Sequence, residues 1–227
     1  MSPNLYIGLS ISKLWVRTQI GVMDMGIYGL TGGIGVGKTT VANLFKEFGI
    51  PVVLADSVGR EVVEKGSQGL SEIVDAFGDS ILDCNGDLNR KALASTVFTD
   101  PANRRQLEGI IHPLVLERSR LLFNRLIQSG NPIVIYESAL LFETNRHHEM
   151  EAVILINSTE KNRISRVQAR DGSAEEEVKQ RIQAQMDEIE KLKLADYLIE
   201  NNTDLTSLKA KVESLITLLL ERETAIT

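Results

Sequence analysis

The sequence predicts an α/β domain of three layers, in which a five-stranded parallel sheet carries helices on both faces. Two observations predict this fold. Five short apolar runs are spread along the 227 residues, and longer segments with the apolar spacing of helices separate them. A glycine-rich loop stands between the first apolar run and the first helical segment, where a sheet of this kind opens onto a ligand.

The glycine-rich loop follows a first strand expected over residues 26–30 and reads Gly-Gly-Ile-Gly-Val-Gly-Lys-Thr over residues 32–39. It matches the phosphate-binding pattern G-x-x-x-x-G-K-[ST], the P-loop, at every fixed position. Glycines let backbone N–H groups turn around an anion, and the N-terminus of the next helix adds partial positive charge. Lys38 adds a full charge near the β- and γ-phosphates, and the hydroxyl of Thr39 is placed to bind Mg²⁺. We therefore expect a nucleotide site formed by Gly33, Ile34, Gly35, Val36, Gly37, Lys38, Thr39 and Thr40.

The first helix is expected over residues 40–48 and the second strand over residues 50–55. That strand ends at Asp56, and a carboxylate beyond the carboxyl end of a strand would face the P-loop crevice as a catalytic base. Aspartate is equally common as the N-cap of a helix, here one that runs from Ser57. The sequence alone leaves both roles open.

Residues 61–130 have a mostly helical pattern with polar faces. Pro101 is expected to start a helix, and Pro113 is expected to kink or interrupt it. Arg90 and His112 lie in this segment. Taken alone, an arginine on a helix is usually solvated, and a lone histidine is usually a surface or satisfied residue.

The third strand, residues 132–137, is apolar and ends in Glu137. An apolar strand that ends in an acid is the Walker B pattern, in which the carboxylate helps to hold Mg²⁺ through water. Because many strands end in acids, this pattern by itself is loose. Together with the hydroxyl of Thr39, Glu137 predicts a magnesium site.

The fourth strand, residues 153–156, precedes three arginines, Arg163, Arg166 and Arg170, whose spacing puts them on one helical face. No acid lies on that stripe, so the three cations would repel one another without an anion. A solvated face is one interpretation, and an arginine-bearing lid that closes over transferring phosphates is the other. Residues 173–176 predict a capping box at the start of the next helix.

The fifth strand, residues 195–200, is followed by Asn201 and Asn202, and the last helix is expected over residues 204–222. This helix should turn one apolar stripe inward, formed by Leu208, Val212, Leu215, Ile216 and Leu219.

The composition argues against a nucleic-acid-binding, disulfide-rich or membrane-spanning protein. A net charge of −6 and a pI near 5.2 argue against a nucleic-acid-binding scaffold, which should be basic. Cys84 is the one cysteine, so there is no disulfide framework, and a reducing cytoplasm fits. The apolar stretch near the start is too short and too polar to span a membrane. We expect residues 1–24 to be a dispensable extension and residues 25–227 to form the functional domain.

The chain resembles the dephospho-CoA kinase family from Met25 almost to its end. The P-loop alone indicates only a nucleotide, whereas the ordered set of motifs is far more specific. Two positions depart from the family pattern, since Ala139 stands where proline is usual and Glu137 stands where aspartate is common. The resemblance rests on residues 29–39, Ala55-Asp56, Ile111-His112-Pro113, Ala139 to Glu143, Arg166 to Arg170, Arg181 to Gln185, and Ala195 to Asn202.

The resemblance implies a P-loop NTPase fold with a core of residues 25–58 and 131–227. It implies a helical acceptor-binding subdomain at about residues 59–130 and a helical lid at about residues 160–190. The implied reaction is the ATP-dependent phosphorylation of the ribose 3′-hydroxyl of dephospho-CoA, which gives CoA and ADP with Mg²⁺ as cofactor.

The resemblance also implies a role for each matched residue. Asp56 would orient the 3′-hydroxyl and accept its proton, while Lys38 and Arg170, helped by Arg166, would neutralise charge on the transferring phosphoryl group. Asn202 would line the adenine pocket. The acceptor would be faced by Arg90 and His112.

Two other interpretations stay open. Another P-loop kinase, for a nucleoside monophosphate or a shikimate-like acceptor, would share the fold and the lid and differ in its acceptor. A non-catalytic ATP-binding regulatory module would leave Asp56 and the lid arginines without a role. We expect small-molecule substrates, no nucleic-acid or membrane partner, and a cytoplasmic monomer or small homo-oligomer.

Overall fold

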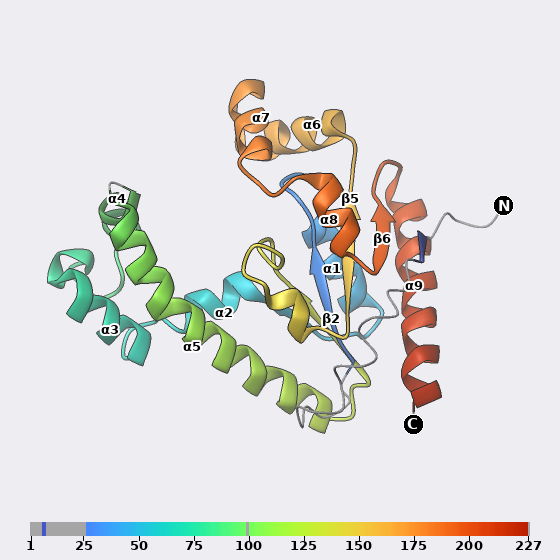
Figure 1. Ribbon diagram of the computed structural model, residues 1–227, viewed down its shortest axis with the longest axis horizontal. Coiled ribbons are helices and arrows are strands. Elements are labelled where there is room, and N and C mark those ends of the chain that lie inside the picture. Colours follow the sequence, from blue (N-terminus) through green and yellow to red (C-terminus); the bar gives the residue numbers. More distant parts are fainter. Residues whose placement is uncertain (1–5, 8–25, 99, 227) are drawn as a thin grey trace. The chain divides into compact units, whose positions relative to one another are not determined.

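The computed structural model describes residues 6–7, 26–98 and 100–226 (Figure 1). Apart from Tyr6 and Ile7, the predicted extension lies outside the described residues. The strands are β1 (Tyr6–Ile7), β2 (Gly26–Thr31), β3 (Val52–Leu54), β4 (Ile133–Glu137), β5 (Ala152–Asn157) and β6 (Tyr197–Glu200). The α-helices are α1 (Lys38–Glu47), α2 (Ala55–Glu61), α3 (Gln68–Phe77), α4 (Arg90–Phe98), α5 (Pro101–Gln128), α6 (Glu160–Asp171), α7 (Glu175–Gln183), α8 (Glu188–Leu194) and α9 (Leu205–Ile226).

The strands form one sheet in the order β1-β6-β5-β2-β4-β3. β2 pairs in parallel with β4 on one side and with β5 on the other, and β6 pairs in parallel with β5. The predicted five-stranded parallel sheet is confirmed. β1 was not predicted, and its residues Tyr6 and Ile7 pair antiparallel with Leu198 and Tyr197 of β6. Two residues are too few for an apolar pattern to reveal a strand.

Helices cover the sheet, and its central strands are buried as a result. Figure 1 shows α8 on the near side of the sheet and α1 on the far side. α1 packs against β2, β4 and α9, and α8 packs against β5. α9 buries the five apolar residues that the sequence predicts. The predicted three-layer arrangement is confirmed, and it leaves the carboxyl ends of the strands for a site.

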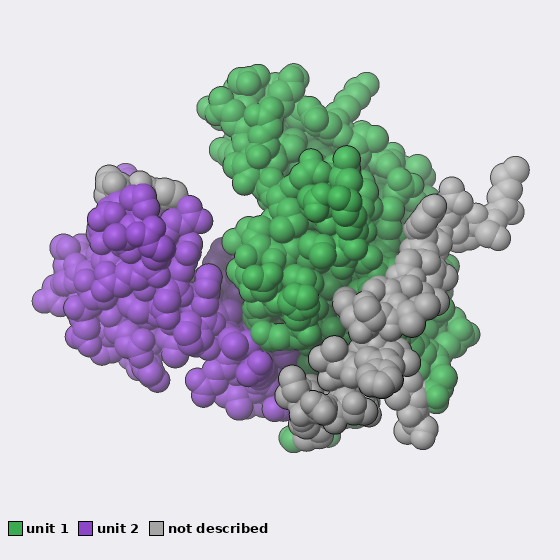
Figure 2. Space-filling model, viewed as in Figure 1, with its two compact units in different colours: residues 1–52, 126–227 green, residues 53–125 purple. Residues whose placement is uncertain are grey.

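The chain divides into two compact units, which Figure 2 colours separately. Unit 1 comprises Met1–Val52 and Leu126–Thr227 and includes the P-loop, α1 and α6 to α9. Unit 2, Val53–Arg125, includes α2, α3, α4 and most of α5. Unit 2 has a hydrophobic core of its own, as expected of a folding subdomain, formed by the buried Val63, Ile73, Ile81 and Leu93.

Two local predictions need correction. Pro113 does not interrupt α5, which continues through it, and the proline is exposed, so water can replace the hydrogen bond that proline cannot donate to Gly109. The capping box of residues 173–176 does not form, because α7 begins at Glu175 with Ala174 as an N-cap that provides no side-chain bond. Three glutamates in the first turn of α7 stabilise that N-terminus through the helix dipole instead. No helix among the described residues is long and apolar enough to cross a membrane.

Candidate functional site

Residues 32–37 connect β2 to α1, and their path depends on backbone angles that glycine accepts readily. Gly37, the N-cap of α1, has a φ of 95°, and a Cβ there would collide with the side-chain amide of Asn201. Gly35 has a φ of 77°, and a Cβ there would lie 2.6 Å from the carbonyl oxygen of Arg163. Asn201 and Arg163 therefore pack closely against the backbone of the loop. The loop leads directly into the N-terminus of α1, as the P-loop pattern predicts.

The side chains that the motif predicts at the phosphates lie in the first turn of α1. The ammonium group of Lys38 donates to the carbonyl oxygens of Gly32 at 2.8 Å and of Gly33 at 3.4 Å, which holds its charge at the loop. Thr39 and Thr40 are exposed in the same turn. A cation and two hydroxyls at a helix N-terminus suit a phosphate with its metal ion.

Glu137, the predicted metal residue, is the last residue of β4, beside the end of β2. In the sheet register Glu137 lies opposite Leu30, and the N–H of Ser138 donates to the carbonyl oxygen of Leu30 at 3.0 Å. The P-loop begins two residues after Leu30. The register therefore brings the carboxylate position to the edge of the sheet at which the phosphate-binding loop starts.

Arg166, a predicted lid arginine, ties the outside of the P-loop to the ends of β5 and β6. Its guanidinium donates to the carbonyl oxygens of Gly35 and Val36, each at 3.3 Å. It also donates to the hydroxyl of Ser158 at 3.1 Å and to the carbonyl oxygen of Asn201 at 2.8 Å. The Asn201 amide donates to the Val36 carbonyl oxygen as well, at 2.8 Å. These bonds make Arg166 a support of the loop.

Asn202, predicted to line the adenine pocket, joins the end of β6 to the start of α6. Its side-chain oxygen accepts from the hydroxyl of Ser158 at 3.0 Å and from the N–H of Thr159 at 2.8 Å. Thr159 is the N-cap of α6, so Asn202 also fixes the start of this helix. The two bonds orient the amide of Asn202 within the same unit as the P-loop.

Arg170 lies at the exposed end of α6 and is bound to the neighbouring carboxylate. It donates to both oxygens of Asp171, at 2.6 and 2.8 Å, and Arg181 of α7 reaches the same carboxylate at 3.5 Å. The hydrogen bonds from Arg170 hold the pKa of Asp171 below its ordinary value, and the charge of Arg181 acts in the same direction. The carboxylate thus joins α6 to α7 at the surface.

The three arginines of α6 have partners, contrary to the prediction that they would repel one another without an anion. Arg163 pairs with Glu188 of α8 at 3.4 Å, and Arg170 pairs with Asp171. Arg166 is bound by the carbonyl oxygens described above. These partners lie on other segments or at the next residue, where the spacing along one helical face cannot reveal them.

Sequence reasoning missed two contacts at Ile34, which lies between Gly33 and Gly35 at the crest of the P-loop. Arg163 is only 6% exposed, and its Nε donates to the carbonyl oxygen of Ile34 at 2.9 Å. The side-chain oxygen of Gln185 accepts from the N–H of Ile34 at 2.8 Å. Burial lowers the pKa of Arg163, and the charge of Glu188 opposes that shift. Gln185 stands in a motif of the resembled family, but the motif does not name its partner.

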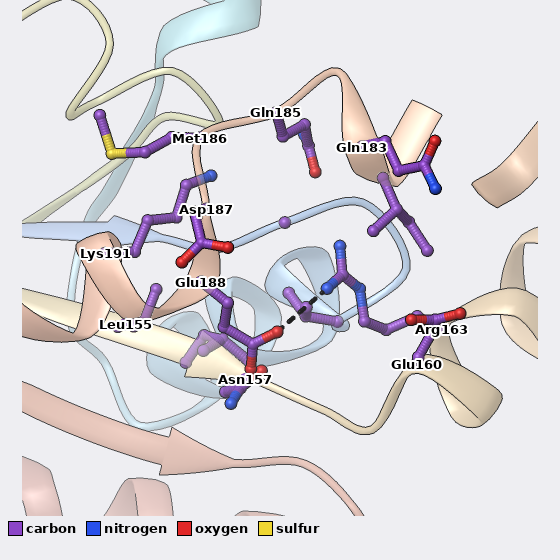
Figure 3. A pocket seen from close by; sticks show the side chains of 14 residues that line it. Leu155, Asn157, Glu160, Arg163, Gln183, Gln185, Met186, Asp187, Glu188 and Lys191 are labelled. Carbon is purple, nitrogen blue, oxygen red and sulfur yellow. Dashed lines mark hydrogen bonds and ion pairs between the residues drawn. The ribbon is translucent and has the colours of Figure 1, made fainter. Parts of the chain in front are cut away.

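A cavity of about 390 Å³ lies beside these contacts (Figure 3). It reaches from the P-loop and the end of β5 to residues 182–191, and both Arg163 and Gln185 line it. Lys191, also in its lining, is 3% exposed and pairs at 3.2 Å with Glu143, which lies in the segment after β4. The ion pairs of Glu188 and Lys191 thus link α6 and the segment that follows β4 through α8.

Three predicted site residues, Asp56, Arg90 and His112, belong to unit 2. Asp56 is exposed in the first turn of α2, whose N-cap is Leu54 and carries no side-chain cap bond. The alternative in which Asp56 caps this helix is therefore wrong, because the helix begins one residue before Asp56. Arg90 opens α4 and His112 lies within α5, and both side chains are exposed.

Comparison with known proteins gives a consistent result. The sequence model of the dephospho-CoA kinase family matches residues 26–207. Proteins named dephospho-CoA kinase from Acinetobacter baylyi and Syntrophotalea carbinolica are 42% and 39% identical to this chain over 184 and 192 residues. These alignments cover 81% and 85% of this chain, and 93% and 91% of the two relatives.

Solved structures show the same fold. The crystal structure of TT1252 from Thermus thermophilus is 35% identical, with a TM-score of 0.72, over 86% of this chain and 98% of that protein. Dephospho-CoA kinase from Campylobacter jejuni is 23% identical, with a TM-score of 0.67, over 88% and 98% of the two chains.

Proposed function

The chain belongs to the dephospho-CoA kinase family, and we propose that it transfers the γ-phosphoryl group of ATP to the ribose 3′-hydroxyl of dephospho-CoA. The products are CoA and ADP. The observation that carries this proposal is a complete P-loop, with Lys38 and Thr39 in the first turn of α1, inside a family match that spans residues 26–207.

Phosphoryl transfer needs positioning and neutralisation of charge more than covalent chemistry. In the proposed step the 3′-oxygen of the acceptor bonds to the γ-phosphorus, and the bond from that phosphorus to the β–γ bridging oxygen breaks. Asp56 receives the proton of the hydroxyl, and ADP leaves with the bridging oxygen. Lys38 and the loop N–H groups hold the charge of the β- and γ-phosphates.

The lid arginines have different parts in this proposal. Arg170 is the better candidate for the transferring phosphoryl group, because its side chain is 64% exposed and held only at the surface. The contacts of Arg166 favour a supporting part behind the loop. We assign Asn202 to the adenine pocket, because two hydrogen bonds to its side-chain oxygen hold its amide in one orientation.

The acceptor site is proposed for unit 2. Asp56, Arg90 and His112 are all exposed there, and all three match positions of the family's motifs or its acceptor-binding subdomain. Two cationic or polar side chains and a carboxylate suit a phosphorylated ribose whose hydroxyl must be oriented and deprotonated.

Mg²⁺, when bound, would neutralise phosphate charge, and Thr39 and Glu137 would hold it, the latter through water. The hydroxyl of Thr39, in the first turn of α1, and the carboxylate of Glu137, at the end of β4, provide the oxygen donors that a hard cation prefers. We expect removal of divalent metal with EDTA to abolish turnover, and added Mg²⁺ to restore it.

The Glu137→Gln variant should need about tenfold more Mg²⁺ for half-maximal rate, because residues that hold a metal through water typically contribute 10- to 100-fold to its affinity. Titration of the rate with Mg²⁺ at saturating ATP measures this. Glu213→Gln, an exposed change on α9, is the control and should behave as the wild type. An unchanged Mg²⁺ requirement in Glu137→Gln would remove Glu137 from the metal site.

ADP release with Mg·ATP tests the acceptor, with dephospho-CoA, AMP, CMP and shikimate compared in parallel. Turnover confined to dephospho-CoA is the expected result. Preference for another acceptor would replace the proposed substrate while retaining a kinase. ATP binding without turnover on any acceptor would favour a regulatory module.

We further propose that the protein acts on small molecules in the cytoplasm, as a monomer or a small homo-oligomer. The single cysteine, Cys84, is exposed, which suits a reducing compartment.

A further inference from the structure

Ile34 stands at the crest of the P-loop between two glycines, Gly33 and Gly35. Glycine has more backbone freedom than any other residue, so a crest with glycine on both sides loses much entropy when it is fixed in one shape. A loop that presents several N–H groups to one anion binds it more tightly when other contacts have already ordered the loop, because the entropy is then not lost on binding.

Both polar backbone groups of Ile34 are held by side chains. Arg163 of α6 donates to its carbonyl oxygen at 2.9 Å, and Gln185, in the segment between α7 and α8, accepts from its N–H at 2.8 Å. Figure 3 shows the side chains of Arg163 and Gln185 in the lining of the cavity beside the loop. A Cβ on Gly33 would lie 2.5 Å from the Arg163 guanidinium and 3.1 Å from the Gln185 side-chain oxygen, so both groups also pack against the loop backbone.

The two side chains are themselves supported. Arg163 is buried and pairs with Glu188 in the first turn of α8. One turn later on α8, the buried Lys191 pairs with Glu143. Ion pairs from α8 therefore hold Arg163 and the segment after β4, and both side chains that hold Ile34 line the cavity of about 390 Å³.

We propose that Gln185 and Arg163 are positioning residues, which hold the crest of the P-loop in the shape that accepts the phosphates of ATP. They act through the backbone of Ile34 and need not touch the nucleotide. The N–H of Ile34 is taken by Gln185, so the phosphates are bound by the N–H groups that follow it. The proposal rests on the assignment of the P-loop as the ATP site.

The Gln185→Met variant tests the proposal, because methionine has a similar length and provides no oxygen acceptor. We expect the Kd and the KM for Mg·ATP to rise about tenfold, the usual effect of one lost hydrogen bond. The kcat should stay within about threefold, and the KM for dephospho-CoA should not change, since the loop acts on nucleotide binding. Gln183→Met is the matched control, since Gln183 lines the same cavity and makes no described contact with Ile34. It should leave Kd, KM and kcat unchanged.

Calorimetric titration with Mg·ATP, steady-state kinetics and thermal unfolding are measured for both variants, with Lys38→Ala alongside. Cooperative unfolding of both Gln→Met variants well above the assay temperature, with weaker ATP binding only in Gln185→Met, supports the proposal. ATP binding as tight as the wild type in Gln185→Met, while Lys38→Ala binds weakly, overturns it and leaves the ATP site intact. Failure of the wild type to bind ATP, or full binding by Lys38→Ala, would instead overturn the proposed function.

A double variant tests whether the two contacts act together. Arg163→Lys keeps a cation opposite Glu188 and removes the Nε donor, so it should also weaken ATP binding. Because both contacts restrain the same residue, the Kd increase in Arg163→Lys/Gln185→Met should be smaller than the product of the single increases. A Kd increase equal to the product of the two single increases would show that the two contacts act independently. If Arg163→Lys does not fold, the comparison of Gln185→Met with Gln183→Met decides alone.

Discussion

Lys38→Ala should lose ATP turnover, with a fall in kcat/KM of about 10³-fold, while the protein remains folded. Removal of one preorganised group that binds developing charge typically costs 10²- to 10³-fold, and Lys38 contributes a full charge rather than a dipole. Its ammonium lies at the loop, bound to the carbonyl oxygens of Gly32 and Gly33. Loss of those bonds should cost about 1 kcal/mol of folding free energy, too little to unfold the domain.

Lys46→Ala is the matched control for this prediction. Lys46 lies in the last turn of the same helix, and its side chain is exposed. The control should keep the wild-type rate. ADP release and thermal unfolding, measured on both variants, separate the site from the fold. ADP release by Lys38→Ala at the wild-type rate would show that the P-loop takes no part in the reaction.

Asp56→Asn should lower kcat by at least about 10²-fold, the usual contribution of a positioned general base. Asparagine has nearly the same shape but cannot take a proton from the acceptor hydroxyl. The change should hardly affect folding, because Asp56 is exposed and provides no cap bond to α2. A carboxylate in the first turn stabilises a helix by at most about 1 kcal/mol through its dipole.

Asp75→Asn, an exposed change on α3 in the same unit, is the control and should keep the wild-type kcat. Single-turnover kinetics at saturating dephospho-CoA and Mg·ATP isolate the chemical step. A loss below about tenfold would show that Asp56 is not the base, since general bases contribute more.

The sheet and the P-loop could be predicted because their signals are local. The fixed spacing of Gly32, Gly37, Lys38 and Thr39 defines one loop, and each strand from β2 onward is a contiguous apolar run. The inward stripe of α9 follows from helical spacing alone, and all five predicted residues are buried. The two residues of β1 carry too little pattern to be recognised.

The contacts around the P-loop could not be predicted, because they join segments far apart in the sequence. Arg163 lies 129 residues from Ile34, and Gln185 lies 151 residues from it. The spacing of the arginines placed them correctly on one helix but gave no partner for any of them. The resemblance implies that Arg166 helps Arg170 to neutralise the phosphoryl charge, and this role stays a prediction. The bonds from Arg166 to the carbonyl oxygens of Gly35 and Val36 could not be inferred from the motif.

The product formed from dephospho-CoA and Mg·ATP decides whether the protein is a dephospho-CoA kinase. We expect one product, CoA, with the new phosphate on the ribose 3′-oxygen, formed in equal amount with ADP. Phosphorus NMR of the product gives the position of the phosphate. ADP formed without a phosphorylated acceptor, or a phosphate at any other oxygen, would show that the protein does not catalyse this transfer.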